Sequence, residues 1–377
     1  MFALGTTSSP PYNFPLPPGL KPGLNAQGGL ISGQASVNVV DPHMLTSYMQ
    51  NFFLGVQREV GGGWIGEIDY IGSMGRHLYA LYNVNRFDGD LIQHAGSFTG
   101  LTPGFGAISY GQANENSSYN GLTGVLKHTG KGVTFNAVYN YSKAIDNASK
   151  LDGPEHVDAF NDKRERGLAD FDTRHRLAFT TLWQIPGPRG NGLYNKAFGG
   201  WELTNVTILQ AGPPSSIICS AAFSPVIVNG VVVGNKGCDY NADANNLDYP
   251  NTPAFGNTLR GLKRSTYLTG MFACGGSVFC SAVFPQPGLG IEGNLGRNTF
   301  HGPGYANTDF STLKNLQIPW FVGNEGANLQ FRTEFFNVFN RVNLTNFNNN
   351  IANLSTFGKS TSTYPSRDIQ FALRLQF

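Results

Sequence analysis

Nine segments of the chain alternate between apolar and polar residues with the period of two that is typical of β-strands. In the clearest one, Val133, Phe135 and Tyr139 alternate with Thr134 and Asn136. The nine segments are 48–60, 64–76, 119–128, 133–142, 174–185, 201–211, 306–316, 327–339 and 368–377. The pattern predicts an all-β protein whose strands are longer than those of most soluble sheets.

The connections between these segments alternate in length. Gly61–Gly63 joins the first two segments, 129–132 joins the third and fourth, and the links after the fifth and seventh are also short. The other connections are long and rich in Gly, Asn, Pro and Ser, and they lie near 77–118, 143–173, 212–305 and 340–366. Short turns at one end and long loops at the other are typical of an outer-membrane β-barrel, with the short turns in the periplasm.

The positions of the charged residues indicate which face of the strands contacts lipid. A Lys or Arg on the lipid face costs about 2–4 kcal/mol at mid-bilayer and about 0–1 near an interface. Arg58 and Lys314 are the exceptions on the apolar face, and both lie at turn ends of their segments. The remaining strand charges fall on the other face, which we expect to line the lumen: Glu67, Asp69, Lys127, Arg176, Arg332, Glu334, Asp368 and Arg374. We expect Arg332 and Glu334 to pair with each other or with a plug.

Composition supports this class. Charged residues make up 13% of the 377, against roughly 25% in soluble domains, while the chain holds 48 Gly, 28 Phe and 15 Tyr. The net charge is +2, with no long basic run, so nucleic acid is not an expected partner. No apolar stretch approaches the length of a transmembrane helix, and Met1–Gly23 is no secretory signal.

No motif supports an enzyme, a cofactor or a metal site. HExxH and GxSxG are absent, and the histidines lie scattered over different connections. Gly288, Gly290 and Gly293 match GxGxxG, but no strand precedes them and no helix pattern follows. We therefore expect a protein without catalytic residues or cofactors.

The four cysteines, Cys219, Cys238, Cys274 and Cys280, all lie in one Gly/Pro/Asn-rich stretch, and none forms a CxxC pair. An even count in a loop favours disulfides formed in an oxidising compartment over zinc ligands. Pairing by proximity gives Cys219 with Cys238 and Cys274 with Cys280, although four cysteines allow three connectivities.

Residues 161–176 form the densest charge cluster, and both signs are present in similar number. One hypothesis is a site for an anionic ligand or a divalent cation, and the other is a salt-bridge network that orders a long extracellular loop. The residues in question are Asp162, Arg164, Arg166, Asp170, Asp172 and Arg174.

Six ordered stretches resemble the C-terminal part of the Oar-like TonB-dependent outer-membrane receptors. They are NFFLGVQREV with WIGEIDYIGSMGRHL, SSYNGLTGVLKHTGKGVTFNAVYNYSKAIDNAS, DKRERGLADFDTRHRLAF, GGWELTNVTILQAG, GNLGRNTFHGPGYANTDFSTLKN and LQFRTEFFNVFNRVNLTNF. The resemblance covers most of the chain from about residue 41 onward. It implies a barrel of about 22 strands with an N-terminal plug, of which this chain holds about nine to ten strands.

The resemblance implies that the parent receptor binds and imports a solute that the sequence does not identify. The resemblance leads us to expect that this chain lacks the plug and the segment that engages TonB, so TonB would be a partner only through that missing region. Residues 1–46 are interpreted as an extracellular loop remnant and 47–377 as the partial barrel. Alternatives are a secreted or surface β-sandwich that binds glycans and a small passive porin with an even strand number.

The terminal segment RDIQFALRLQF ends on the periplasmic side. Its apolar residues resemble the C-terminal signal that the barrel-assembly machinery recognises: Phe371, Leu373, Leu375 and Phe377. An odd count of nine strands departs from the even number of bacterial barrels and leaves two open edges. The expected location is the bacterial outer membrane, with lipid as the main partner of the apolar face.

Overall fold

A computed structural model describes residues 34–149, 158, 160–188, 192–256, 262–275, 278–318 and 326–376. Nine long strands dominate it, and each coincides with one of the nine predicted segments. They are β2 (Tyr48–Gly61), β3 (Trp64–Asn83), β4 (Phe105–Gly130), β5 (Val133–Asp146), β7 (His175–Gln184), β8 (Trp201–Gln210), β15 (Tyr305–Ile318), β16 (Ala327–Phe336) and β17 (Asp368–Gln376). The prediction of an all-β protein is confirmed.

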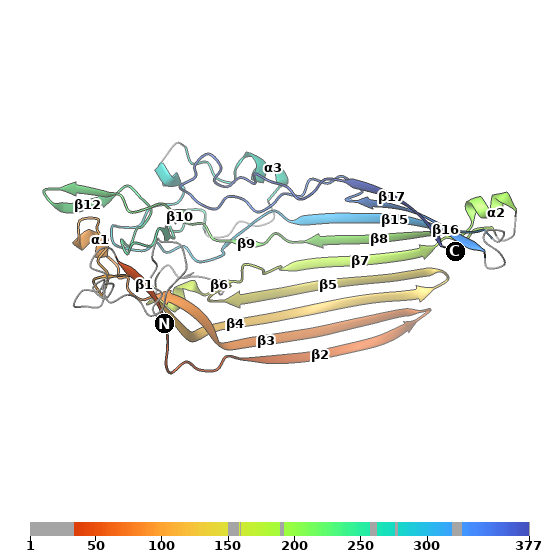
Figure 1. The fold of residues 1–377 in the computed structure, drawn as a ribbon, viewed down its shortest axis with the longest axis horizontal. Coiled ribbons are helices and arrows are strands. Elements are labelled where there is room, and N and C mark those ends of the chain that lie inside the picture. Colours follow the sequence, from red (N-terminus) through yellow and green to blue (C-terminus); the bar gives the residue numbers. More distant parts are fainter. Residues whose placement is uncertain are drawn as a thin grey trace, which may run out of the picture.

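The nine strands form one antiparallel sheet, the wall, in the order β17-β16-β15-β8-β7-β5-β4-β3-β2. Neighbours in the wall are also neighbours in sequence among the long strands, as in an up-and-down barrel. The strands run side by side, with the long connections gathered at one end and the C-terminal strand ending at the other (Figure 1). Among the described residues β2 and β17 do not pair with each other, so the wall is open.

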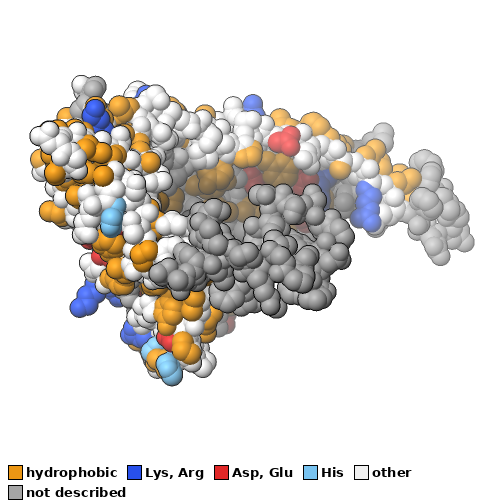
Figure 2. All heavy atoms as spheres, turned by 60° about the vertical axis from the view of Figure 1, so that its left-hand side comes forward, with side chains coloured by type: hydrophobic (Ala, Val, Ile, Leu, Met, Phe, Trp, Pro, Cys, Tyr) orange, Lys and Arg blue, Asp and Glu red, His pale blue; other side chains and the backbone are white. Residues whose placement is uncertain are grey.

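The strand register places one set of side chains on a single face across the whole wall. Tyr70 pairs with Leu122, Leu122 with Tyr141, and Tyr139 with Leu177. The same face continues through Leu209, Phe310, Phe335 and Ile369, which are joined to it by successive register pairs. The predicted apolar face is therefore continuous, and many of its side chains are exposed, as expected for a surface that contacts lipid. Figure 2 brings the long-loop end of the molecule forward, and there hydrophobic side chains lie among scattered charged ones.

The opposite face carries polar contacts between neighbouring strands and within a strand. Lys127 and Glu67 form an ion pair at 3.2 Å, and Gln57 donates to the same carboxylate. Arg332 and Glu334 lie 3.7 Å apart, which is the mutual pairing that the sequence predicts. These contacts satisfy side chains that would be costly against lipid, so this face is the lumen side of the wall.

Lys314, one of the charged residues on the apolar face, bonds to backbone groups of the adjacent turn. Its ammonium donates to the carbonyl oxygens of Ala197, at 3.0 Å, and Gly199, at the end of helix α2 (Leu193–Phe198) in the short β7–β8 connection. It also lies 5.1 Å from the ring centre of Trp201. The charge thus reaches the turn instead of lipid, which is the behaviour called snorkelling.

The boundaries of two predicted elements were wrong. The predicted loop at 77–118 is shorter, because β3 continues to Asn83 and β4 begins at Phe105. His77 adopts φ 54°, and the register shifts between Gly75 and Leu78, so this bulge breaks the period of two on which the prediction rested. Strand β16 ends at Phe336, since Asn337 has φ 50° and leaves the extended conformation.

Strand β1 (Ala35–Val40) lies in the region interpreted as a loop remnant and pairs in parallel with the upper part of β4. Val37 lies opposite Ile108 there. Strand β6 (Gly167–Leu168) pairs with the upper end of β5. Because β1 runs parallel to β4, it cannot be a further strand of an antiparallel barrel. The wall therefore has nine antiparallel strands among the described residues.

The remaining described elements are short and lie in the long connections. They are α1 (Asp90–Gln93), η2 (Asp162–Glu165), β9 (Pro214–Ser215), β10 (Cys219–Ser220), β11 (Pro225–Val228), β12 (Val231–Asn235), β13 (Leu247–Asp248), α3 (Arg264–Thr269), η3 (Val278–Cys280) and β14 (Phe300–His301). No helix in the described part of the chain is long and apolar enough to cross a membrane. The long strands there belong to one sheet, whereas a β-sandwich needs two packed sheets, so the sandwich alternative fails.

Candidate functional site

The long connections fold into a body of their own, which we call the loop module: the described residues of 84–104, 212–304 and 337–367. Its core is apolar and aromatic, with Phe284 packed against Phe272, Phe300 and Phe357 at ring-centre distances of 5.0–5.9 Å. The buried members are Ile217, Cys219, Cys238, Tyr240, Tyr249, Tyr267, Cys280, Phe284, Leu295, Phe300, Leu344, Phe347, Ile351 and Phe357. Because all of them come from loops, the module is held together independently of the wall.

Two disulfides cross-link the loop module. Cys219 bonds to Cys238 and Cys274 to Cys280, the connectivity that proximity in sequence suggests. Cys219, Cys238 and Cys280 are buried within the core. Each bond closes a short loop and restricts the unfolded chain.

A cluster of buried carboxyl groups lies beneath the surface of the module, and the sequence reasoning missed it. Burial raises the pKa of Asp239 to about 6 and that of Asp243 to about 7. Both Asp239 oxygens accept backbone hydrogen bonds, from Asp243 at 3.0 Å and Ala244 at 2.9 Å. The available signal was the density of acids in DYNADANNLDY, 239–249.

Asp248 and Glu292 are interacting neighbours in this acidic cluster. Burial, reinforced by the neighbouring Glu292, raises the pKa of Asp248 to about 10, and burial raises that of Glu292 to about 8. Glu292 pairs with Arg164 at 3.3 Å and accepts the Tyr249 N–H at 2.7 Å. Both contacts lower its pKa, so desolvation outweighs them. At neutral pH the cluster therefore retains protons that exposed carboxyl groups would lose.

The predicted charge cluster does not converge on one point. Arg164 reaches Glu292 and the Gly293 carbonyl oxygen in the loop module. Asp170 accepts the Asn298 amide at 2.6 Å. Asp162 begins η2.

The last residues of that cluster contact the wall. Asp172 accepts the Ala144 N–H of β5 at 2.7 Å and lies 4.0 Å from Arg174. The guanidinium of Arg174 stands 6.0 Å from the ring centre of Tyr141. These contacts are those of a network that fixes a loop between wall and module. No group of three or more His, Cys, Asp or Glu side chains within the described ranges is arranged to hold a metal ion.

A buried ion pair also joins module and wall. Arg297 donates to the Asp146 carboxylate at the end of β5, and each side chain is only 6% exposed. Further donation to the Leu168 carbonyl oxygen, at 3.3 Å, ties β6 to the same guanidinium. Removing one partner would leave an uncompensated buried charge.

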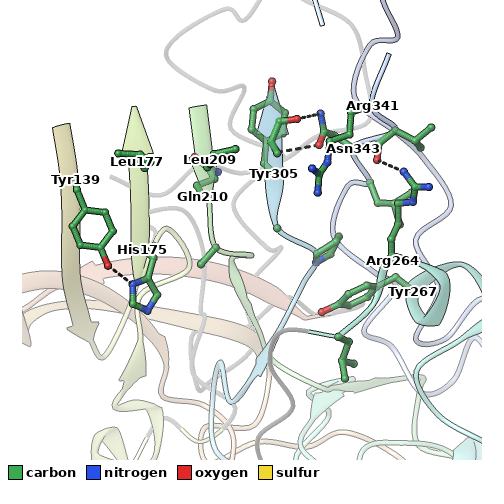
Figure 3. Close-up of a pocket in the computed structure, with 17 residues that line it drawn as sticks. Tyr139, His175, Leu177, Leu209, Gln210, Arg264, Tyr267, Tyr305, Arg341 and Asn343 are labelled. Atoms are coloured by element: carbon green, nitrogen blue, oxygen red, sulfur yellow. Dashed lines mark hydrogen bonds between the residues drawn. The ribbon is translucent and has the colours of Figure 1, made fainter. Parts of the chain in front are cut away.

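A pocket of about 510 Å³, the rim pocket, lies where β5, β7, β8 and β15 meet the loop module (Figure 3). Tyr139, Leu177, Leu209 and Ala306 contribute from the apolar face of the wall. The Tyr139 hydroxyl lies 2.9 Å from His175 Nδ1.

Arg264, Arg341 and Asn343 contribute to the rim pocket from the module (Figure 3). Arg264 donates to the Val342 carbonyl oxygen at 3.3 Å, and Asn343 exchanges two hydrogen bonds with the backbone of Ala306. The described lining contains two arginines and no carboxylate, so the pocket favours anions.

The predicted assembly residues lie on β17. Phe371, Leu373 and Leu375 project on the apolar face of this edge strand and are exposed. Phe377 lies outside the described residues. A role in assembly stays a prediction.

Comparison with known proteins gives a family and a fold. A family model described as an outer membrane beta barrel domain matches residues 3–370. No curated protein matches the chain.

Two solved structures are similar to the chain. The outer membrane transporter YddB from Escherichia coli shares 11% identity with a TM-score of 0.47 over 92% of this chain. The FrpB iron transporter from Neisseria meningitidis, F3-3 variant, shares 11% identity with a TM-score of 0.42 over 90%. The chain spans 34% and 32% of these two transporter chains, about a third of each.

Proposed function

The chain belongs to the outer membrane β-barrel domain family and is located in the bacterial outer membrane, and from this premise we propose that it forms the C-terminal barrel portion of an Oar-like TonB-dependent receptor. The observation that carries the proposal is the open wall. Nine strands have an apolar outer face and a polar lumen face, and within the described part of the chain the edges at β2 and β17 have no strand partner. Unpaired backbone groups are costly in lipid, so these edges need further strands to close the barrel.

The parent receptor would bind its solute at the extracellular end and pass it through the lumen. The loop module supports this role, since it is a packed, disulfide-linked body at the end of the wall where the long loops gather (Figure 1). Binding residues commonly sit on loops that a rigid scaffold positions. Energised uptake would require the plug and the TonB-engaging segment, and insertion would use the barrel-assembly machinery.

The size of the cellular protein tests the barrel portion of this proposal. An antibody raised against residues 212–256 should detect, in the outer-membrane fraction, a protein with an apparent mass well above that of 377 residues. A detergent-resistant barrel of only this size would contradict the proposal and favour the small porin.

Uptake tests the receptor portion. Cells lacking the gene and cells lacking TonB are compared with wild-type cells for accumulation of a panel of radiolabelled solutes. We expect at least one solute whose accumulation falls at least tenfold in both strains. Loss of small-solute diffusion that is independent of TonB would refute the import function.

A further inference from the structure

A shallow groove descends from the rim pocket along the apolar face of the wall. It has a volume of about 490 Å³. Its lining is mainly apolar, with Val56, Ile68, Leu126 and Ala137, and it also includes Arg58 and Glu67 toward the short-turn end. Tyr139 and Leu177 line both the groove and the rim pocket, so the two hollows are continuous. The groove on the apolar face of the wall thus adjoins, at its extracellular end, the rim pocket with its two arginines.

Two glycines make the groove. Gly66 and Gly124 lie on the apolar face, opposite Leu126 and Ile68 respectively. A Cβ atom added at either position would meet nothing within 4 Å. Side chains at these two positions would fill the channel, so their absence keeps an open path between Ile68, Leu126 and Tyr139.

The cations at the top of the groove come from the extracellular loops. Arg264 and Arg341 are exposed and belong to the loop module, just beyond the ends of β7 and β8. A second hollow of about 390 Å³ is lined by Lys143 and Arg166, and also by Arg174 and Arg297, which pair with Asp172 and Asp146. The extracellular rim therefore presents basic groups on the side that faces lipid.

We propose that the rim pocket and the groove bind one phosphate-bearing lipid of the outer leaflet, with its phosphate between Arg264 and Arg341 and an acyl chain in the groove. Arginine suits phosphate because its planar guanidinium donates in pairs to the phosphate oxygens. The apolar groove below accepts a hydrocarbon chain, and the Tyr139 and His175 pair lies at the boundary, where aromatic side chains favour the membrane interface. A free anion would use the arginines alone and leave the groove empty.

The binding experiment uses the full chain in detergent micelles, with binding followed by native mass spectrometry. The probes are diphosphorylated lipid A, its dephosphorylated form and inorganic phosphate. We expect the diphosphorylated lipid to bind at least tenfold more tightly than either of the other two probes. Equal binding of inorganic phosphate would overturn the proposal in favour of a simple anion site, and equal binding of the dephosphorylated lipid would overturn the role of the arginines.

Three variants test phosphate binding by the arginines and acyl-chain binding by the groove separately. R264Q with R341Q should weaken lipid binding at least tenfold, and G124L should weaken it by blocking the groove without affecting phosphate. R176Q is the matched control, because Arg176 lies at the same height on the lumen face of β7 and should leave binding unchanged. Far-UV circular dichroism of each variant checks folding. Unchanged binding in R264Q/R341Q, or an equal loss in R176Q, would refute the site.

Discussion

Replacing Glu292 by Gln is expected to make the loop module more resistant to opening at alkaline pH than it is in the native chain. Glu292 is buried and its pKa is raised from 4.5 to about 8. A pKa raised on folding means that the folded state binds the proton more tightly. The stabilisation that the proton on Glu292 gives to the folded state is complete below pH 4.5 and is lost as the pH rises through about 8.

The structure gives the magnitude. Each pH unit between the unfolded and folded pKa values corresponds to about 1.4 kcal/mol, so ionising Glu292 costs roughly 5 kcal/mol of folding free energy above pH 8. Because Glu292 lies close to Asp248, part of this free-energy cost arises from the ionisation of both groups together. Gln keeps an oxygen that accepts the Tyr249 N–H and carries no charge, although it gives up the ion pair with Arg164.

The assay is amide hydrogen exchange at pH 6 and pH 9, corrected for intrinsic exchange rates and run with EDTA so that no cation neutralises the carboxylates. The reporters are the N–H groups of Gly290, Gly293 and Leu295, which bond within the module. Their opening free energy should fall between the two pH values in both proteins, because Asp248 titrates in both. The fall should be smaller in E292Q by up to about 3 kcal/mol, the share of Glu292 between pH 6 and its pKa of about 8. E59Q, at an exposed acid on β2, is the control. Equal opening free energies at both pH values in the native chain would refute the reasoning.

Three further predictions concern the wall and its attachment. Phe179→Arg, on the apolar face, should destabilise the protein in bilayers by about 2–4 kcal/mol, and Thr180→Arg, on the lumen face, by much less; urea unfolding in lipid vesicles measures both. C219S with C238S should cost the loop module roughly 2–4 kcal/mol, seen as faster proteolysis of loops with wall peptides unaffected. Arg297→Met should cost about 3–5 kcal/mol, and adding Asp146→Leu should recover part of that loss in thermal unfolding; a double variant less stable than R297M would contradict the buried-pair account.

The wall could be predicted from sequence because a period of two maps directly onto the two faces of a strand. Residues 133–142 show this, since every odd position lies on the apolar face. Prediction failed where the backbone departs from the regular strand. His77, with its positive φ, shifted the alternation and hid the upper part of β3.

The acidic cluster and the rim pocket could not be predicted from the sequence for a different reason. Asp248 and Glu292 are 44 positions apart, and Tyr139 and Arg341 are farther still, so only the fold brings them together. Loops carry no periodicity from which such contacts follow. The charge cluster at 161–176 was visible, but its separate partners in the wall and the module were not.

The self-contained core of the loop module has a consequence for evolution. Because Phe284 and its neighbours pack only against other loop residues, substitutions on the module's outer surface leave the strand register unaffected. Substitutions on that surface can therefore accumulate without selection against membrane insertion. The wall and the module can therefore diverge at different rates within one gene.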